Sequence, residues 1–116
     1  MVIRVDASPQ VLTVWLSGEL DHHAARSLRE QVDSLISRSP AGAMRLDFSG
    51  VTFMDSSGIG LIMGRYRLMA ARGGTLTVVG ASERLLRVMK LAGLEKLPIW
   101  ETKTAEPITT KRRVRR

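Results

Sequence analysis

The most informative part of the sequence is Phe53-Met54-Asp55-Ser56-Ser57-Gly58-Ile59-Gly60, where an apolar run gives way to a polar turn and then to a helical pattern. Asp and Ser are strong helix N-cap residues, because their short side chains accept hydrogen bonds from the free backbone N–H groups at a helix start. We therefore predict a strand ending near Met54, a cap at Asp55 or Ser56, and a helix over residues 57–72. The turn carries two hydroxyls and one carboxylate, so we place the candidate site here.

Ser57 falls in the first turn of that helix, where unpaired N–H groups and the helix dipole favour an added negative charge. The helix would tolerate a phosphate on this serine, although the neighbouring Asp55 would repel it. Gly58 and Gly60 carry no side chains, so we expect open space through which another protein's active site approaches the hydroxyl. The alternative is that Asp-Ser-Ser is only a cap and that the glycines only ease packing, because capping serines are common.

The segment before this stretch reads as two strands, joined by a turn at Ser8-Pro9-Gln10, and a helix. Residues 11–17 are rich in β-branched and aromatic types, which favour a strand, and Gly18 ends it. Asp21 is the candidate cap of a helix over residues 22–37. The expected core face of this helix, at spacings of three and four, consists of Ala25, Leu28, Val32, Leu35 and Ile36.

The segments on either side of the helix at 57–72 read as further strands and one more helix. Residues 44–48 alternate as a strand, and Ser49-Gly50 is expected to break it before residues 51–54. After Gly73-Gly74, residues 75–79 form a short strand, and residues 97–100 are a last strand or an extended segment. Ser82 is expected to cap a helix to about residue 91, with inward residues Leu85, Val88, Met89 and Ala92.

The helix at 57–72 carries more apolar residues than one face requires. Its predicted core stripe consists of Ile59, Ile62, Met63, Tyr66, Met69 and Ala70. Leu61 and Leu68 lie off that stripe, where they either dock a partner or pack under a neighbouring helix. We favour packing, because folded proteins expose much apolar surface in any case.

The alternation of strands and helices after an initial hairpin predicts an α/β fold. We expect a single domain with a mixed four- to five-stranded sheet and three to four helices. Loops at the carboxyl ends of parallel strands gather function in such folds. If the strands before Asp21 and Asp55 run parallel, Asp21 and Ser57 are neighbours.

The composition is that of one ordinary globular domain: 116 residues, 44% apolar and 25% charged. The chain has no cysteine, which excludes disulfides, thiolate metal sites and a cysteine nucleophile. No apolar run approaches the roughly 18 residues that span a bilayer, and the N-terminus lacks a signal pattern. We expect a cytoplasmic protein with no membrane partner.

The positive charge belongs to the C-terminal end. The net charge is +7, and five basic residues lie within 111–116; the remaining 13 basic residues face 11 acidic ones, which leaves +2. We divide the chain into a domain at 1–106 and a basic tail at 107–116, expected to be disordered and solvated. Clustered Lys and Arg attract nucleic-acid phosphates, but the tail has no interleaved aromatics and no recognition helix, so direct nucleic-acid binding is not expected.

Metal, cofactor and catalytic motifs are weak in this chain. His22 and His23 are adjacent and point about 100° apart on a helix, and no third ligand pattern follows, so no metal site is predicted. The interval from Gly58 to Gly64 does not fit GxGxxG, and no Walker sequence is present, so no cofactor-binding residue is predicted. Ser57 lacks the G-x-S-x-G pattern, which leaves a small hydrolase as the weaker alternative and no residue assigned as catalytic.

Three segments carry a family resemblance: Gly18-Glu19-Leu20-Asp21-His22-His23-Ala24, Phe53 to Gly60, and Gly64-Arg65-Tyr66. In order and spacing they resemble the sporulation-type anti-sigma factor antagonists of the STAS domain family, over residues 1–105. The resemblance implies a STAS-like fold and a non-enzymatic switch protein. The basic end departs from the family pattern, and the resemblance gives it no role.

The resemblance also implies partners and site residues. The phosphorylated residue is the serine directly before the first glycine of the motif, Ser57, with Ser56 as the runner-up. The unphosphorylated form binds a partner that is both anti-sigma factor and serine protein kinase, with its own Mg-ATP, and so releases a sigma factor; a serine phosphatase resets the switch. The alternative is a constitutive STAS scaffold or ligand-sensing module that is never phosphorylated. The expected partner-binding residues are Asp21, His22, Asp55, Ser56, Gly58, Ile59 and Leu61.

Overall fold

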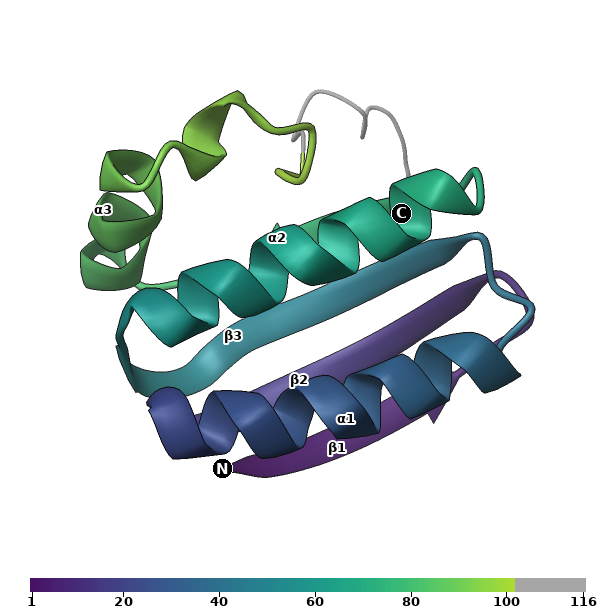
Figure 1. The fold of residues 1–116 in the computed structure, drawn as a ribbon, viewed down its shortest axis with the longest axis horizontal. Helices are drawn as coiled ribbons and strands as arrows, with labels where there is room; N and C mark the ends of the chain where they lie inside the picture. The colour runs from purple at the N-terminus through teal and green to yellow at the C-terminus, as the bar shows by residue number, and fades with distance from the viewer. Residues whose placement is uncertain (102–116) are drawn as a thin grey trace, which may run out of the picture.

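In the computed structural model, which describes residues 1–101, one sheet of four strands carries two long helices (Figure 1). The first strand pairs antiparallel with the second, whereas the second and third, and the third and fourth, pair parallel. The predicted mixed sheet is confirmed, and it has four strands. In spatial order they are β1 (Val2–Ala7), β2 (Val11–Leu20), β3 (Ala43–Met54) and β4 (Thr75–Val79).

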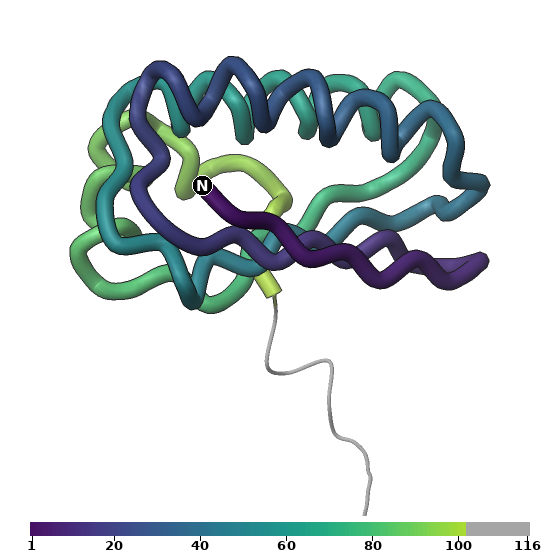
Figure 2. Tube along the Cα trace, turned by 90° about the horizontal axis from the view of Figure 1, so that it is seen from below, coloured from purple at the N-terminus to yellow at the C-terminus, as the bar shows by residue number. Residues whose placement is uncertain are grey.

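Helices α1 (His22–Arg38) and α2 (Ser56–Ala71) lie side by side on one face of the sheet, as Figure 2 shows in the turned view. Helix α3 (Glu83–Leu91) and a short 3-10 helix, η1 (Leu94–Lys96), follow β4. Residues 97–100 were expected to form either a last strand or an extended segment. They form no strand, and a single bridge joins Trp100 to Val78, which agrees with the extended alternative. The boundary predicted at residue 106 and the basic tail at 107–116 lie outside the described residues.

The core lies between the sheet and the two long helices. Because side chains alternate along a strand, β2 and β3 each turn every second residue toward the helices. On the opposite face Trp15 is half-buried, and the Arg4 guanidinium lies 4.5 Å from the centre of its ring. The fully buried residues that fill the core from β2 and β3 are Leu12, Val14, Leu16, Leu20, Met44, Leu46 and Phe48.

The predicted break at Ser49-Gly50 is wrong, because β3 continues through it as one strand of 12 residues. Its pairing with β2 shifts register between Trp15 and Ser17, which makes an irregularity at Gly50. A Cβ on Gly50 would lie 2.6 Å from the Ser17 Cβ and 2.9 Å from the Leu16 carbonyl oxygen. The glycine therefore permits a close approach at a bulge inside the strand and does not end it.

The helix faces also differ in part from the prediction. In α1 four of the five expected core residues are buried, and Leu35 is half-buried. In α2 the stripe is rotated: Ala70 is exposed, Met63 and Tyr66 are half-buried, and Leu61 is buried. The reason is that α2 packs against α1 as well as the sheet, so a second side of it is covered. Ala92, expected to face inward, is exposed and lies beyond the end of α3.

Candidate functional site

The turn after β2 and the turn after β3 lie at the same edge of the sheet. The two strands pair in parallel as far as Leu20 and Met54, and the Asp55 backbone N–H donates to the Leu20 carbonyl at 3.4 Å. The parallel arrangement on which the predicted proximity of Asp21 and Ser57 depended is therefore confirmed. The direct contact across this edge is made by His22, the residue after Asp21.

Both acidic residues of this edge cap a helix. The Asp21 carboxylate accepts from the Ala24 N–H at 2.9 Å, and the Asp55 carboxylate accepts from the Ser57 N–H at 2.8 Å. Asp55 is thus the cap of α2, and the alternative cap, Ser56, is the first helical residue. The Ser57 N–H therefore already has an acceptor. It could donate to a phosphate, as the sequence suggested for the free N–H groups of this helix start, only if the phosphate displaced Asp55.

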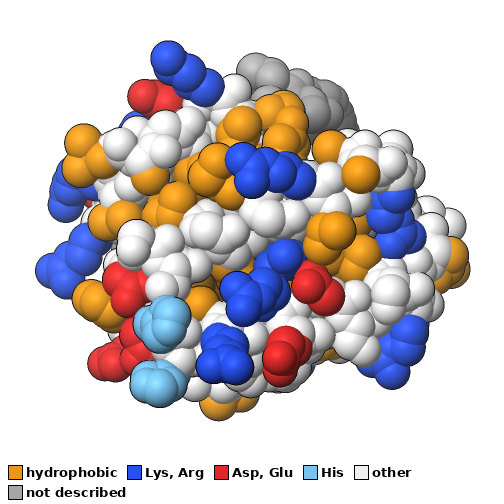
Figure 3. All heavy atoms as spheres, in the orientation of Figure 1, with side chains coloured by type: hydrophobic (Ala, Val, Ile, Leu, Met, Phe, Trp, Pro, Cys, Tyr) orange, Lys and Arg blue, Asp and Glu red, His pale blue; other side chains and the backbone are white. Residues whose placement is uncertain are grey.

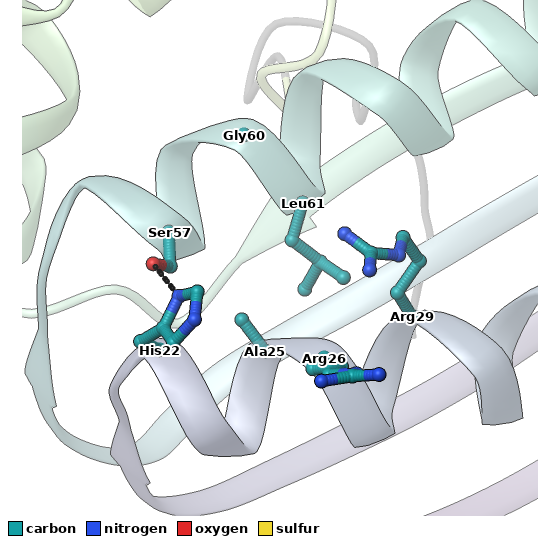
Figure 4. A pocket seen from close by; sticks show the side chains of 7 residues that line it. All are labelled: His22, Ala25, Arg26, Arg29, Ser57, Gly60 and Leu61. Carbon is teal, nitrogen blue, oxygen red and sulfur yellow. Dashed lines mark hydrogen bonds between the residues drawn. The ribbon is translucent and has the colours of Figure 1, made fainter.

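The Ser57 hydroxyl faces α1. Its Oγ lies 3.5 Å from the His22 Nδ1, at the outer limit of a hydrogen bond (Figure 4). Ser57 is half-buried, whereas Ser56 is exposed. The two serines of the motif therefore differ in surroundings, and Ser57 is the one that contacts the neighbouring helix.

A cavity of about 450 Å³ opens beside this contact, between α1 and α2. Its basic lining comes from α1: two arginines and a histidine line it together with Ser57, and among residues 1–101 no carboxylate does. Figure 3 shows basic side chains over the two helices close to the two histidines. We name this cavity the α1/α2 groove, and its lining residues are His22, Ala25, Arg26, Arg29, Ser57, Gly60 and Leu61.

The two glycines of the motif have different roles. Gly58 is buried against the end of β3, where an added Cβ would lie 2.6 Å from the Met54 Sδ and 3.1 Å from a Leu20 methyl. The open space expected at Gly58 is absent, because the start of α2 packs tightly on the strand that precedes it. Gly60 lines the groove with no atom within 4 Å of its Cβ position, so the expected open space exists there.

The remaining predicted partner-binding residues divide by exposure. Ile59 is 9% exposed and Leu61 is 4% exposed, so with buried Gly58 they offer a partner little surface. For Leu61 the favoured alternative, packing under the neighbouring helix, is confirmed, whereas for Leu68 it is wrong, because that side chain is 42% exposed. His22 and Ser56 are exposed, and Asp21 and Asp55 are half-buried. Partner contact by these seven residues stays a prediction.

Sequence reasoning missed a buried charge between the two helices. Arg65 of α2 is 6% exposed, and its Nε lies 2.9 Å from the Asp33 Oδ1 of α1. Neither atom has a partner that satisfies hydrogen-bond geometry, and Arg65 Nη1 has none among the described residues, so the contact is chiefly electrostatic. The available signal was spacing: Arg65 follows Leu61 and precedes Met69 by four residues, which puts it on a buried stripe.

The charged neighbours of Arg65 shift its pKa in opposite directions. Burial lowers the pKa of Arg65 from its ordinary value, Asp33 acts to raise it, and Arg29 acts to lower it. Arg29 is also part of the α1/α2 groove, so positive charge extends from the groove toward the buried pair. The charged side chains that line the groove are basic, and such a lining favours an anion.

In residues 1–101 no group of three His, Cys, Asp or Glu side chains converges as metal ligands require. Within the same range, no helix combines the length and apolar character needed to cross a bilayer.

Comparison with known proteins gives consistent matches over almost the whole described region. The family model "Mlab, STAS domain" matches residues 3–100. The anti-sigma F factor antagonist of Paenibacillus polymyxa is 40% identical over 100 residues, which cover 85% of this chain and 86% of that protein.

Solved structures agree with the sequence matches. The unphosphorylated anti-sigma factor antagonist SpoIIAA is 28% identical, with a TM-score of 0.75 over 90% of this chain and 91% of that one. The phosphorylated form of SpoIIAA, a Bacillus cell fate determinant, is 28% identical and has a TM-score of 0.68 over 90% of this chain and 95% of that one. The resemblance drawn from the three segments is confirmed, and the chain belongs to the STAS domain family, among relatives named anti-sigma factor antagonists.

Proposed function

We propose that this protein is an anti-sigma factor antagonist that is switched by phosphorylation of Ser57. In its unmodified form it binds an anti-sigma factor that is also a serine protein kinase, and the bound sigma factor is released. Phosphorylation then weakens that binding. The observation that carries the proposal is the Ser57 hydroxyl at the mouth of a basic groove, 3.5 Å from His22 on the neighbouring helix, in a chain whose relatives are named antagonists.

The phosphoryl transfer needs only an acceptor from this chain. The Ser57 Oγ attacks the γ-phosphorus of Mg-ATP held by the partner, an Oγ–P bond forms, and the bond to the β-phosphate oxygen breaks to release ADP. The hydroxyl proton passes to a base of the partner. The Mg-ATP belongs to the kinase, and this protein acts as a binding protein without an enzymatic activity of its own.

Two features favour Ser57 over Ser56 as the acceptor. Ser57 lines the groove, so a group attached there changes a surface built by both helices, whereas Ser56 is exposed outside the groove lining. Ser57 also corresponds to the serine before the first glycine of the family motif. Ser56 remains the runner-up, because its hydroxyl is the more accessible of the two.

The energetics of the switch follow from charge. A phosphoserine adds roughly −1.5 to −2 charges at neutral pH, beside the carboxylate of Asp55. A few kcal/mol of lost contact and repulsion lowers affinity by about a hundredfold or more, since each 1.4 kcal/mol is tenfold. No refolding is required, because the charge appears on the docking surface itself. A serine phosphatase would restore the binding form, and the setting that fits these partners is the cytoplasm, in a sporulation pathway.

The proposal is tested with a candidate kinase/anti-sigma partner, the anti-sigma F factor for which the Paenibacillus polymyxa relative is named. Intact mass is measured after incubation with Mg-ATP for wild type, Ser57→Ala and Ser56→Ala. We expect one added phosphate in wild type and Ser56→Ala and none in Ser57→Ala, with partner affinity lost only in the phosphorylated samples. Tight binding without any phosphate gain would support the constitutive scaffold instead.

A further inference from the structure

We propose that the α1/α2 groove is an intramolecular receptor for the phosphoryl group of Ser57, held there by His22 and by the two arginines of α1 that line the groove, Arg26 and Arg29. This inference rests on the phosphorylation proposed above and states where the added group goes. The phosphoserine does not simply project into solvent. It turns into the groove and is bound by residues of the neighbouring helix.

The first support is geometric. Ser57 Oγ is already 3.5 Å from the His22 Nδ1, and both residues line the same cavity of about 450 Å³. Figure 4 shows the Ser57 hydroxyl directed toward His22, with the Arg26 and Arg29 side chains farther along the same helix. Gly60 leaves the α2 side of the groove open, since nothing lies within 4 Å of its Cβ position. A phosphoryl group on Oγ therefore has space and a polar contact in the direction of the groove.

The second support is the charge that surrounds this space. From α1 the groove receives His22, Arg26 and Arg29, and it receives no carboxylate. Two carboxylates stand at its edge: Asp55 and Asp21, each accepting from a backbone N–H of the helix that it caps. His23 lies with its ring centre 6.1 Å from that of His22 and is not part of the lining.

These charges decide which way the phosphate turns. Arginine binds phosphate oxygens through charge-assisted hydrogen bonds, and a protonated imidazole adds a second donor. Asp55 repels a phosphate that points back toward the cap. Repulsion from one side and attraction from the other both direct the group into the groove. Phosphorylation then fills the basic groove with a negatively charged group, and the surface formed by α1 and α2 changes in both shape and charge.

The inference is tested on the full chain with phosphoserine placed at position 57 during translation, so that no kinase is needed. The pH titration of the phosphate is followed by ³¹P NMR in wild type, His22→Gln, Arg26→Gln and the control Arg38→Gln, which alters an exposed arginine at the far end of α1. Ring ¹⁵N resonances of His22 and His23 are compared before and after phosphorylation.

We expect the phosphate of the wild-type protein to titrate about one pH unit below the value near 6 that is usual for phosphoserine, because nearby positive charges favour the dianion. In His22→Gln and in Arg26→Gln the phosphate should titrate closer to pH 6 than in wild type, and in Arg38→Gln it should titrate as in wild type. The His22 ring resonances should move toward those of an imidazolium, and the His23 resonances should not.

A phosphate that titrates as it does in an unstructured peptide, with the two histidine rings affected alike, would overturn the receptor. The phosphate titration and the comparison of the two histidines are both made on the wild-type sequence. The proposal can therefore be tested even if a groove variant fails to fold. Because phosphoserine is installed directly, failure here is separate from failure of the kinase experiment, which bears on the proposed function alone.

Discussion

Arg65 and Asp33 join α2 to α1 through an ion pair that is unequally buried. Their Nε and Oδ1 atoms lie 2.9 Å apart, yet the Arg65 side chain is 8% exposed and that of Asp33 is 41% exposed. Water can hydrate the Asp33 carboxylate apart from its buried Oδ1, but it hardly reaches the Arg65 guanidinium. The cost of breaking the pair should therefore depend on which partner is removed.

Asp33→Ala is expected to destabilise the fold by about 3 kcal/mol, because it leaves a buried cation without its counter-charge. Arg65→Leu should cost less, about 1 kcal/mol, because the remaining Asp33 is hydrated and the leucine fills part of the space. Urea denaturation of both variants measures this difference. The double variant should regain stability over Asp33→Ala alone, and a larger loss for Arg65→Leu than for Asp33→Ala would refute the asymmetry.

Gly58→Ala and Gly60→Ala should change stability in opposite directions. At Gly58 the new methyl meets Met54 and Leu20, so we expect a loss of about 1–3 kcal/mol from overpacking. At Gly60 it meets nothing within 4 Å, so the better helix propensity of alanine should add about 0.5–1 kcal/mol. Thermal unfolding followed by circular dichroism provides the measurement. Equal effects at both positions would contradict the packing described at the start of α2.

Substitutions of Asp55 should separate its capping role from its charge. Asp55→Ala removes the acceptor of the Ser57 N–H and is expected to cost about 1 kcal/mol. Asp55→Asn keeps a cap of similar quality, so its stability should remain within about 0.5 kcal/mol of wild type. Denaturant unfolding tests both changes. Comparable losses in the two variants would show that the negative charge, and not the hydrogen bond, stabilises α2.

Phe53 is the candidate anchor for the anti-sigma partner. Its side chain is 48% exposed two residues before the cap of α2, and aromatic residues often carry much of the binding energy of an interface. We expect Phe53→Ala to weaken partner binding by about tenfold or more, measured by calorimetry, without loss of stability. Leu68→Ala is the control, because Leu68 is 42% exposed but lies eleven residues beyond Ser57 along the same helix. An equal effect of both changes on binding would show that the interface is not centred on the motif turn.

Much of the local structure could be predicted from the sequence because it depends on residues that are close in the chain. The Asp55 carboxylate caps α2 through a residue two positions away, and the Asp21 carboxylate caps α1 through one three positions away. The apolar periodicity of α1 likewise predicted all four of its fully buried residues. The family motifs then identified the fold, which the parallel pairing of β2 and β3 confirmed.

The tertiary structure decided what depends on distant residues. Gly50 reads as a strand end until Ser17 is placed against it, and the choice left open for Leu61, between docking and packing, is settled by its burial beside α1. The contact between His22 and Ser57 joins residues 35 positions apart, and no local pattern predicts how two helix starts will meet. The caps, the motif turn and the family can be recognised without the structure, because short-range hydrogen bonds and periodicity encode them. Only the packing of α1 beside α2 created the basic groove, because its charges come from one helix and its serine from the other.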